Sequence, residues 1–428
     1  MKAVFSLSQF FRSLCIMLLA VAAAFPQEGF FRLEARKGVW WIIDPQGVPT
    51  LSIGVDHISY ESDRVKGNGR CPYCEALDHS YIDHNAWGLE ALARMRLWGF
   101  NTIGAWSDAE LWAHAMPYTI ILDFAARSGA NWQSGLPADV YEPRFEQTAR
   151  RIAEEICQPR RFDPELLGYF SDNELRWGQD WRGKETMLDM YLSFPAASTG
   201  REKAVEFLRA KYAQDIHKLD QAWAVSAVDF EKITSPGITE AYRSDAAEFL
   251  ENVATRYFEV SARAIHEADP NHLYLGARFA GKPPKAALRG ARQADVVSIN
   301  VYDFDPRPAV QAAYAVTGRP ILVGEFAFRT ENSGLPNTKG AGPKVPDQAA
   351  RAKAYADYVT HLESLPEAVG YHWFEWVDEP WEGRFDGENS NYGLVDILDH
   401  PYQEFVEAVR QANTAALEAH RKAVGGGQ

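Results

Sequence analysis

The segment Leu166–Gly178, LLGYFSDNELRWG, changes abruptly from apolar to polar. Its first half, through Phe170, has the continuous apolar character of a strand buried on both faces in a parallel sheet. Asn173 and Glu174 then fall at the carboxyl end of that strand, the face where a (β/α)8 barrel places its catalytic groups. Neighbouring Tyr, Phe and Trp side chains are expected to raise the pKa of Glu174, which suits a general acid. A helix start with Asp172 or Asn173 as N-cap is the alternative interpretation.

Eight short apolar runs alternate with helical patterns, which indicates an α/β fold, a parallel sheet closed into a (β/α)8 TIM barrel. The expected strands cover residues 51–59, 101–106, 118–124, 166–170, 273–279, 295–301, 320–326 and 369–376. Helices are expected at residues 85–100, 143–157, 246–269, 348–365 and 401–420. Because no glycine-rich phosphate fingerprint follows a strand, a nucleotide site is not expected.

Three segments lie outside this alternation. Residues 30–50 predict a short N-terminal β-hairpin around the turn at 44–47. Residues 61–81 form an expected long loop, of the kind that shapes a binding site on the top face of a barrel. Residues 186–244 have a mainly helical pattern and predict an insertion after strand four.

Length and composition favour one large domain and exclude a nucleic-acid partner. The chain has 428 residues, 46% of them hydrophobic, so a single barrel over residues 25–424 has ample core. The formal net charge is −14, and no basic run or patch is visible. A polyanionic partner is therefore not expected.

The first 24 residues predict a targeting segment rather than part of the fold. Lys2 and Arg12 accompany an apolar run, residues 14–24, that ends in three alanines. This pattern is typical of a signal peptide cleaved after small residues, so we expect a secreted or periplasmic protein, with an uncleaved anchor as the alternative. No later stretch is long enough to span a bilayer. The glycine-rich tail, residues 425–428, is expected to be disordered.

Cys71 and Cys74 form a CxxC pair. In an exported protein a local disulfide is the favoured interpretation. A redox motif would need a thioredoxin-like βαβ context, and a zinc site would need a second ligand pair. Cys157 lies in a helical pattern and is expected to be a small core residue.

A second carboxylate ends strand seven. Glu325 closes the apolar run that begins at Ile321, and burying its charge would be costly unless it were paired or functional. The carboxyl ends of strands four and seven are expected to face each other across the barrel mouth, which brings Glu325 opposite Glu174. Two facing carboxylates are what cleavage of a glycosidic bond requires: one protonates the leaving oxygen and the other attacks the anomeric carbon.

These positions resemble the clan A glycoside hydrolases. Proteins of this clan have a (β/α)8 barrel with an Asn-Glu pair on strand four and a nucleophilic Glu on strand seven, the positions of Asn173-Glu174 and Glu325. The resemblance implies retention of configuration through a glycosyl-enzyme intermediate. It also implies that Asn173 binds the sugar 2-hydroxyl, that Tyr302 holds the nucleophile, and that Trp373 forms the floor under the sugar ring.

A narrower resemblance covers most of the chain after the leader, to the β-agarases of glycoside hydrolase family fifty. It rests on five stretches: Gly38–Gly54, Gly168–Gly178, Gly324-Glu325-Phe326, Gly370–Trp376 (GYHWFEW) and Asp386–Gly393 (DGENSNYG). This resemblance implies a β-linked galactan or related oligosaccharide as the substrate.

Further side chains near the expected mouth are candidates for substrate binding. Arg278, which ends strand five, is expected to pair with Glu325 and keep it ionised. A structural salt bridge is the alternative for Arg278. The remaining candidates are His57 for a sugar hydroxyl, Trp106 and Trp177 for stacking, and Glu375, Glu388 and Asn389 as polar residues near the mouth. For these, core packing or a solvated loop is the alternative.

The sequence predicts no cofactor and no metal. A metal hydrolase on this barrel would need clusters of His and Asp at several strand ends, and His57 and His372 are too few. The sugar, its linkage and the choice of endo or exo action remain open. An exo-acting β-galactosidase-like or β-glucosidase-like enzyme, and a carbohydrate-binding barrel without turnover, are the alternative functions.

Overall fold

A computed structural model describes residues 28–233 and 239–425, the side chains through residue 420. The predicted targeting segment, residues 1–24, lies outside the described residues, as do residues 426–428 of the predicted tail. Within the described part of the chain, no helix is both long and apolar enough to cross a membrane.

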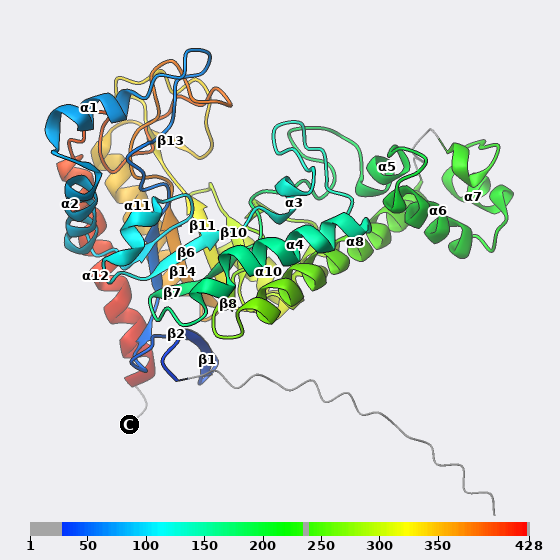
Figure 1. The fold of residues 1–428 in the computed structure, drawn as a ribbon, viewed down its shortest axis with the longest axis horizontal. Coiled ribbons are helices and arrows are strands. Elements are labelled where there is room, and N and C mark those ends of the chain that lie inside the picture. Colours follow the sequence, from blue (N-terminus) through cyan, green and yellow to red (C-terminus); the bar gives the residue numbers. More distant parts are fainter. Residues whose placement is uncertain (1–27, 234–238, 426–428) are drawn as a thin grey trace, which may run out of the picture.

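In the part of the chain that the structure describes, nine parallel strands form the central sheet. The predicted barrel is confirmed (Figure 1). In chain order they are β4 (Ser52–Val55), β5 (Thr102–Ile103), β6 (Tyr118–Ile121), β7 (Leu166–Phe170), β8 (Leu273–Tyr274), β9 (Phe279–Ala280), β10 (Val297–Asn300), β11 (Ile321–Phe326) and β14 (Ala368–Trp373). Their order in the sheet is β8-β7-β6-β5-β4-β14-β11-β10-β9. The two ends of this sheet are therefore both parts of the predicted fifth strand.

The fifth strand is divided because its middle residues leave the strand conformation. Gly276 lies in the gap between β8 and β9 and has a φ of +81°, a left-handed conformation that glycine adopts without steric cost. Main-chain hydrogen bonds continue on both sides of the gap, from Leu275 N to Tyr169 O (2.8 Å) and from Gly281 N to Asn300 O (2.8 Å). The ring of strands closes through this divided segment.

The described part of the chain forms α-helices, most of which surround the sheet (Figure 1). They are α1 (Pro72–Ser80), α2 (His84–Leu97), α3 (Phe124–Arg127), α4 (Pro143–Ile156), α5 (Met187–Leu192), α6 (Thr199–Lys211), α7 (Ile216–Trp223), α8 (Glu240–Ala268), α9 (Lys285–Gly290), α10 (Arg307–Thr317), α11 (Gln348–Glu363) and α12 (Gln403–Gly425). Figure 1 shows α5, α6 and α7 gathered away from the sheet, at the far end of the long helix α8. These three helices lie within the stretch expected as an insertion.

Two local expectations need correction. The predicted long loop at residues 61–81 contains α1, whose first turn is closed by a disulfide between Cys71 and Cys74. The N-terminal hairpin has a third strand: β1 (Arg32–Arg36) pairs with β2 (Val39–Ile43), and β2 pairs with β3 (Pro49–Thr50) across the predicted turn. The remaining two strands, β12 (Arg329–Thr330) and β13 (Lys344–Val345), form a small parallel pair.

The N-terminal sheet closes the lower end of the barrel. Phe31 and Ile42 share a buried cluster with Leu167, Leu322 and Val369 from three barrel strands. Leu166 and Tyr169 of β7 belong instead to the larger core under the helices. Apolar packing thus fills the barrel from below, which leaves its carboxyl ends for polar groups.

A substitution at Gly168 can test how closely β7 and β8 are packed. A Cβ atom at this position would lie 2.2 Å from the carbonyl oxygen of Leu273, a backbone atom that cannot move aside. We expect Gly168→Ala to lower the free energy of unfolding by about 2 kcal/mol or more, the cost of overpacking a dense core, as measured by denaturant unfolding. Glu165→Ala is the control, because Glu165 contacts Tyr118 through its main-chain oxygen. Equal stability of the two variants would contradict the close packing.

Candidate active site

The carboxyl ends of β7, β10 and β11 bring six polar side chains together. Asn173 and Glu174 follow β7, Asn300 ends β10, Tyr302 follows it, and Glu325 lies in β11. Arg278 enters from the gap in the fifth strand. Of the sequence-predicted residues, this group contains Asn173, Glu174, Arg278, Tyr302 and Glu325; Asn300 was not predicted.

Glu325 is held by a hydroxyl and a guanidinium. The Tyr302 hydroxyl donates to Glu325 Oε2 at 2.6 Å, and Arg278 Nη1 lies 3.2 Å from Glu325 Oε1. Arg278 is completely buried and also pairs with Asp56, at the end of β4. Glu325 is thus part of a buried chain of charges, carboxylate–guanidinium–carboxylate.

Gly324, just before Glu325, leaves room for this chain of charges. A Cβ atom on Gly324 would lie 2.8 Å from Asn300 Oδ1 and 3.0 Å from Arg278 Nε. Arg278 Nη2 also donates to the main-chain oxygen of Gly324 at 2.6 Å. The glycine of the Gly-Glu-Phe motif is therefore required by the side chains that pack against it.

Glu174 is positioned by its main chain and by an amide. Its φ of +45° is left-handed, a conformation that non-glycine residues rarely adopt and that re-aims the side chain after the strand. Its N–H donates to Arg278 O at 2.9 Å, and its Oε1 accepts from Asn300 Nδ2 at 3.1 Å.

The alternative interpretation of this segment, a helix start, is wrong. No helix begins at residues 172–174 in the structure. The Asp172 carboxylate instead accepts from Ala125 N, in the first turn of α3, at 2.9 Å.

Glu174 and Glu325 are close enough for the charge of Glu174 to affect the pKa of Glu325. Burial raises the pKa of Glu174 and of Glu325. For Glu325, the positive charge of Arg278 opposes this increase, whereas the negative charge of Glu174 adds to it. Arg278 and the Tyr302 hydroxyl both stabilise the charged form of Glu325 and so oppose the effect of burial on its pKa.

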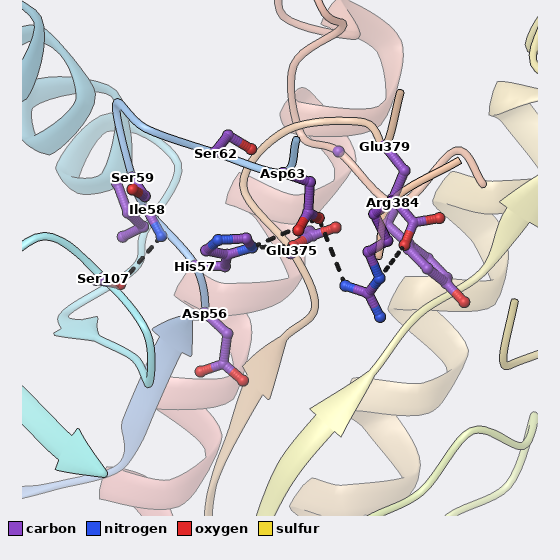
Figure 2. A network of polar contacts seen from close by, with 12 residues as sticks. Asp56, His57, Ile58, Ser59, Ser62, Asp63, Ser107, Glu375, Glu379 and Arg384 are labelled. Atoms are coloured by element: carbon purple, nitrogen blue, oxygen red, sulfur yellow. Dashed lines mark hydrogen bonds and ion pairs between the residues drawn. The ribbon is translucent and has the colours of Figure 1, made fainter. Parts of the chain in front are cut away.

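His57 lies in a second network at the mouth, shown in Figure 2. His57 Nδ1 is 2.5 Å from Glu375 Oε2 and 3.9 Å from Asp63 Oδ2. Arg384 continues the network, with Nη1 3.5 Å from Asp63 and Nε 2.9 Å from Glu379. Burial lowers the pKa of His57, but the charges of Asp63 and Glu375 outweigh it and raise that pKa to about 9. These carboxylates therefore favour the imidazolium form of His57.

The same side chains offer donor atoms for a metal ion. Within the described residues, His57, Asp63 and Glu375 place one ligand atom each within 4.8 Å of one another. The protonated His57 and the neighbouring Arg384 already supply positive charge to these carboxylates. We therefore assign no metal to this group.

Two predicted aromatic binding residues, Trp373 and Trp177, are buried rather than exposed at the mouth. Trp373 has no exposed surface; it packs against Phe326, Phe405 and other aromatic rings and donates to Tyr392 O at 2.9 Å. It therefore lies beneath the mouth and is not the floor under a sugar ring. Trp177 is also buried, stacked on Phe258 at 5.8 Å between ring centroids.

Asn389 joins two loops rather than facing the mouth. Its Oδ1 accepts from the main-chain N–H of Thr338 at 2.9 Å, and its Nδ2 donates to the Thr338 hydroxyl at 3.0 Å. Glu388, its neighbour, pairs with Arg384 Nη2 at 2.8 Å. Both side chains stabilise the loop that carries Arg384.

Trp106 remains at the mouth, 36% exposed, with the Arg278 guanidinium 4.5 Å from its ring centroid. A second aromatic group escaped the sequence analysis. The ring centroid of Trp132 lies 6.4 Å from that of Trp181 and 6.4 Å from that of Phe385. The Trp181 side chain is 62% exposed and that of Phe385 is 55% exposed. Both exposed residues could have been identified from the sequence as candidates for substrate binding. Trp181 closely follows the Asn-Glu segment, and Phe385 adjoins the stretch that resembles β-agarases.

Asn300, Asp56 and Arg384 were also missed. Asp56 and Asn300 stand at the ends of predicted strands, so a search for polar residues at every strand end would have found them. Arg384 lies in a loop whose path the sequence does not give.

No family model matches the chain. β-Agarase B of Vibrio sp. (strain JT0107) is 29% identical over an alignment 460 residues long, which covers 90% of this chain and 48% of that protein. β-Agarase A of the same organism is 28% identical and covers 90% of this chain and 45% of that protein. The chain therefore spans about half the length of the curated relatives it matches.

Solved structures give the same relationship. The structure of an exo-β-agarase has a TM-score of 0.79 and 25% identity, covering 92% of this chain and 66% of that one. A β-galactosidase from Halorubrum lacusprofundi shares the fold, with a TM-score of 0.55 and 17% identity over 78% of this chain and 56% of that one. The resemblance to β-agarases that the sequence motifs indicate is thereby confirmed over nine tenths of this chain.

Proposed function

We propose that the chain is a secreted, retaining β-glycosidase that resembles β-agarases and hydrolyses a β-linked galactan or related oligosaccharides. The observation that carries the proposal is the placement of Glu325 between Tyr302 and Arg278, with Glu174 close enough to affect its pKa. Arg278 and Tyr302 favour the ionised form of Glu325, so in this proposal Glu174 is the carboxyl that carries the proton. The similarity to β-agarases supports this chemistry.

The reaction has two displacements. In the first, Glu325 attacks the anomeric carbon while Glu174 gives its proton to the leaving glycosidic oxygen, so a glycosyl-enzyme ester forms as the aglycone departs. In the second, Glu174 takes a proton from water, the hydroxyl adds to the anomeric carbon, and the bond to Glu325 breaks. Asn173 binds the sugar 2-hydroxyl, a contact that strengthens in the transition state.

The aromatic side chains at the mouth support a saccharide substrate. Trp106, Trp181 and Phe385 expose large ring surfaces near the glutamates, and Trp132 connects the last two. Such rings bind the apolar faces of sugars, and exposing them to water would otherwise be unfavourable. His57 and Glu375 supply charged partners for sugar hydroxyls.

Export is part of the proposal. The apolar leader followed by small residues is its basis. The disulfide between Cys71 and Cys74 is consistent with an oxidising compartment.

Replacing Glu325 should remove turnover, because no other group in the site can form the ester. The measurement is product release from agarose and its oligosaccharides, galactans, glucans, and aryl β-galactosides and β-glucosides, by wild type, Glu325→Ala and the exposed control Glu154→Ala. Hydrolysis confined to glucosides or simple galactosides would support the exo-acting alternatives and contradict the galactan substrate. Saccharide binding without turnover in any variant would identify a non-catalytic barrel.

Azide should separate the two glutamates. A small anion entering the space left by Glu174→Ala needs no general base, so azide should restore turnover of an aryl glycoside with a good leaving group and give the β-glycosyl azide. In Glu325→Ala the anion attacks directly from the opposite face and should give the α-glycosyl azide. The anomeric configuration of each product, read by NMR, checks the assignment, and reversed products would contradict it.

Tyr302→Phe should move the acidic limb of the kcat/KM profile to higher pH. The Tyr302 hydroxyl donates to the charged form of Glu325 and lowers its pKa, so its loss raises the pKa and leaves the nucleophile protonated over a wider acidic range. The control is Tyr314→Phe, on α10, whose hydroxyl is near Trp40 Nε1. An unchanged or lower acidic limb in Tyr302→Phe would contradict this role.

A further inference from the structure

Asn300 is the side chain that connects the two residues of the Asn-Glu pair. It is the last residue of β10 and is completely buried. Its Nδ2 donates to Asn173 Oδ1 and to Glu174 Oε1, each at 3.1 Å. Both hydrogens of one amide group are therefore used by the two neighbouring residues.

This arrangement distinguishes the two oxygens of Glu174. Oε1 accepts a hydrogen bond from an N–H donor that has no lone pair to offer in return. A proton on Oε1 would point at that donor, so the contact with Asn300 disfavours protonation of Oε1. The geometry therefore places the transferable proton on Oε2.

Trp132 is a second, weaker side-chain donor to the Glu174 carboxyl: it lowers the pKa of Glu174 less than Asn300 does. Among the described residues, Glu174 has no cationic nitrogen within ion-pair distance, in contrast to Glu325 with Arg278. Two further hydrogen bonds fix its backbone and not the carboxyl: its N–H donates to Arg278 O at 2.9 Å, and its main-chain oxygen accepts from Arg182 Nη1 at 3.0 Å. Asn300 is thus the stronger of the two side-chain donors to this carboxyl, and it is the one that also holds Asn173.

We propose that Asn300 is a positioning residue for the general acid. It orients the Glu174 carboxyl so that Oε2 carries the proton, and it holds the Asn173 side chain in place beside Glu174. The inference rests on the proposed function. Asn300 acts through Glu174 and Asn173 and has no contact with the reacting atoms in this role.

The test compares leaving groups. An aryl β-glycoside with a poor leaving group needs the proton of Glu174 in the first displacement, and one with a good leaving group does not. For Asn300→Ala we expect kcat/KM to fall about 10²-fold with the poor leaving group, the lower range for loss of general acid catalysis. The fall should be several times smaller with the good leaving group.

The pH profile is the second readout. Asn300 donates to the charged form of Glu174 and so lowers the pKa of its carboxyl. Removing the donor raises that pKa, so Glu174 keeps its proton to higher pH and the basic limb of kcat/KM moves upward. Asn300→Asp should move it further, because a carboxylate adds repulsion in nearly the same volume.

The control lies on the same strand. Ser298 is also buried, and its hydroxyl donates to Leu275 O at 2.7 Å, away from the glutamates. Ser298→Ala should leave both substrates and both pH limbs unchanged. Melting temperatures of all variants are recorded, and Asn300→Asp, which preserves the volume, provides the test if Asn300→Ala does not fold.

Equal losses for both leaving groups, with an unmoved basic limb, would overturn the inference and leave Asn300 a packing residue. Glu174→Ala distinguishes this from a failure of the proposed function. If Glu174→Ala discriminates between leaving groups and the Asn300 variants do not, only the inference fails. If the wild type hydrolyses neither aryl glycoside nor any of the polysaccharides, the proposed function fails and the inference with it.

Discussion

The buried guanidinium of Arg278 is the interaction on which the mouth of the barrel depends. It has no exposed surface and lies between the carboxylates of Asp56 and Glu325. A buried charge is tolerated only when it is paired and hydrogen-bonded, so each member of this chain requires the others. Arg278 reaches this position because the fifth strand is interrupted, and its main-chain oxygen at the same interruption accepts the N–H of Glu174.

The same environment makes two identical side chains different. Glu325 receives a cation and a hydroxyl, whereas Glu174 receives the neutral donors of Asn300 and Trp132. Pairs of carboxyls whose surroundings separate their proton affinities are the usual basis for dividing acid and nucleophile roles. The division here is produced by neighbours on β10 and in the gap of the fifth strand, and not by the strands that carry the glutamates.

Much of the fold and the centre of the site could be predicted because the relevant signals are local. Apolar runs of strand length and the order of strands and helices place each strand in the ring. Polar residues that end such runs, Asn173-Glu174 and Glu325, must then point into the mouth. The helix α1 was missed because its segment is rich in loop-forming residues, and the N-terminal sheet was assigned one strand too few because β3 is only two residues long.

The sequence by itself determined the barrel and the two glutamates, since both follow from periodicity and from position at strand ends. Only the tertiary structure decided which side chains surround each glutamate. Trp373 is buried and Asn389 joins two loops because rotation at a strand end and the path of a long loop depend on packing across the whole ring. The contact of Asn300 with Glu174 joins residues 126 positions apart in the chain, and no local pattern encodes a meeting at that distance.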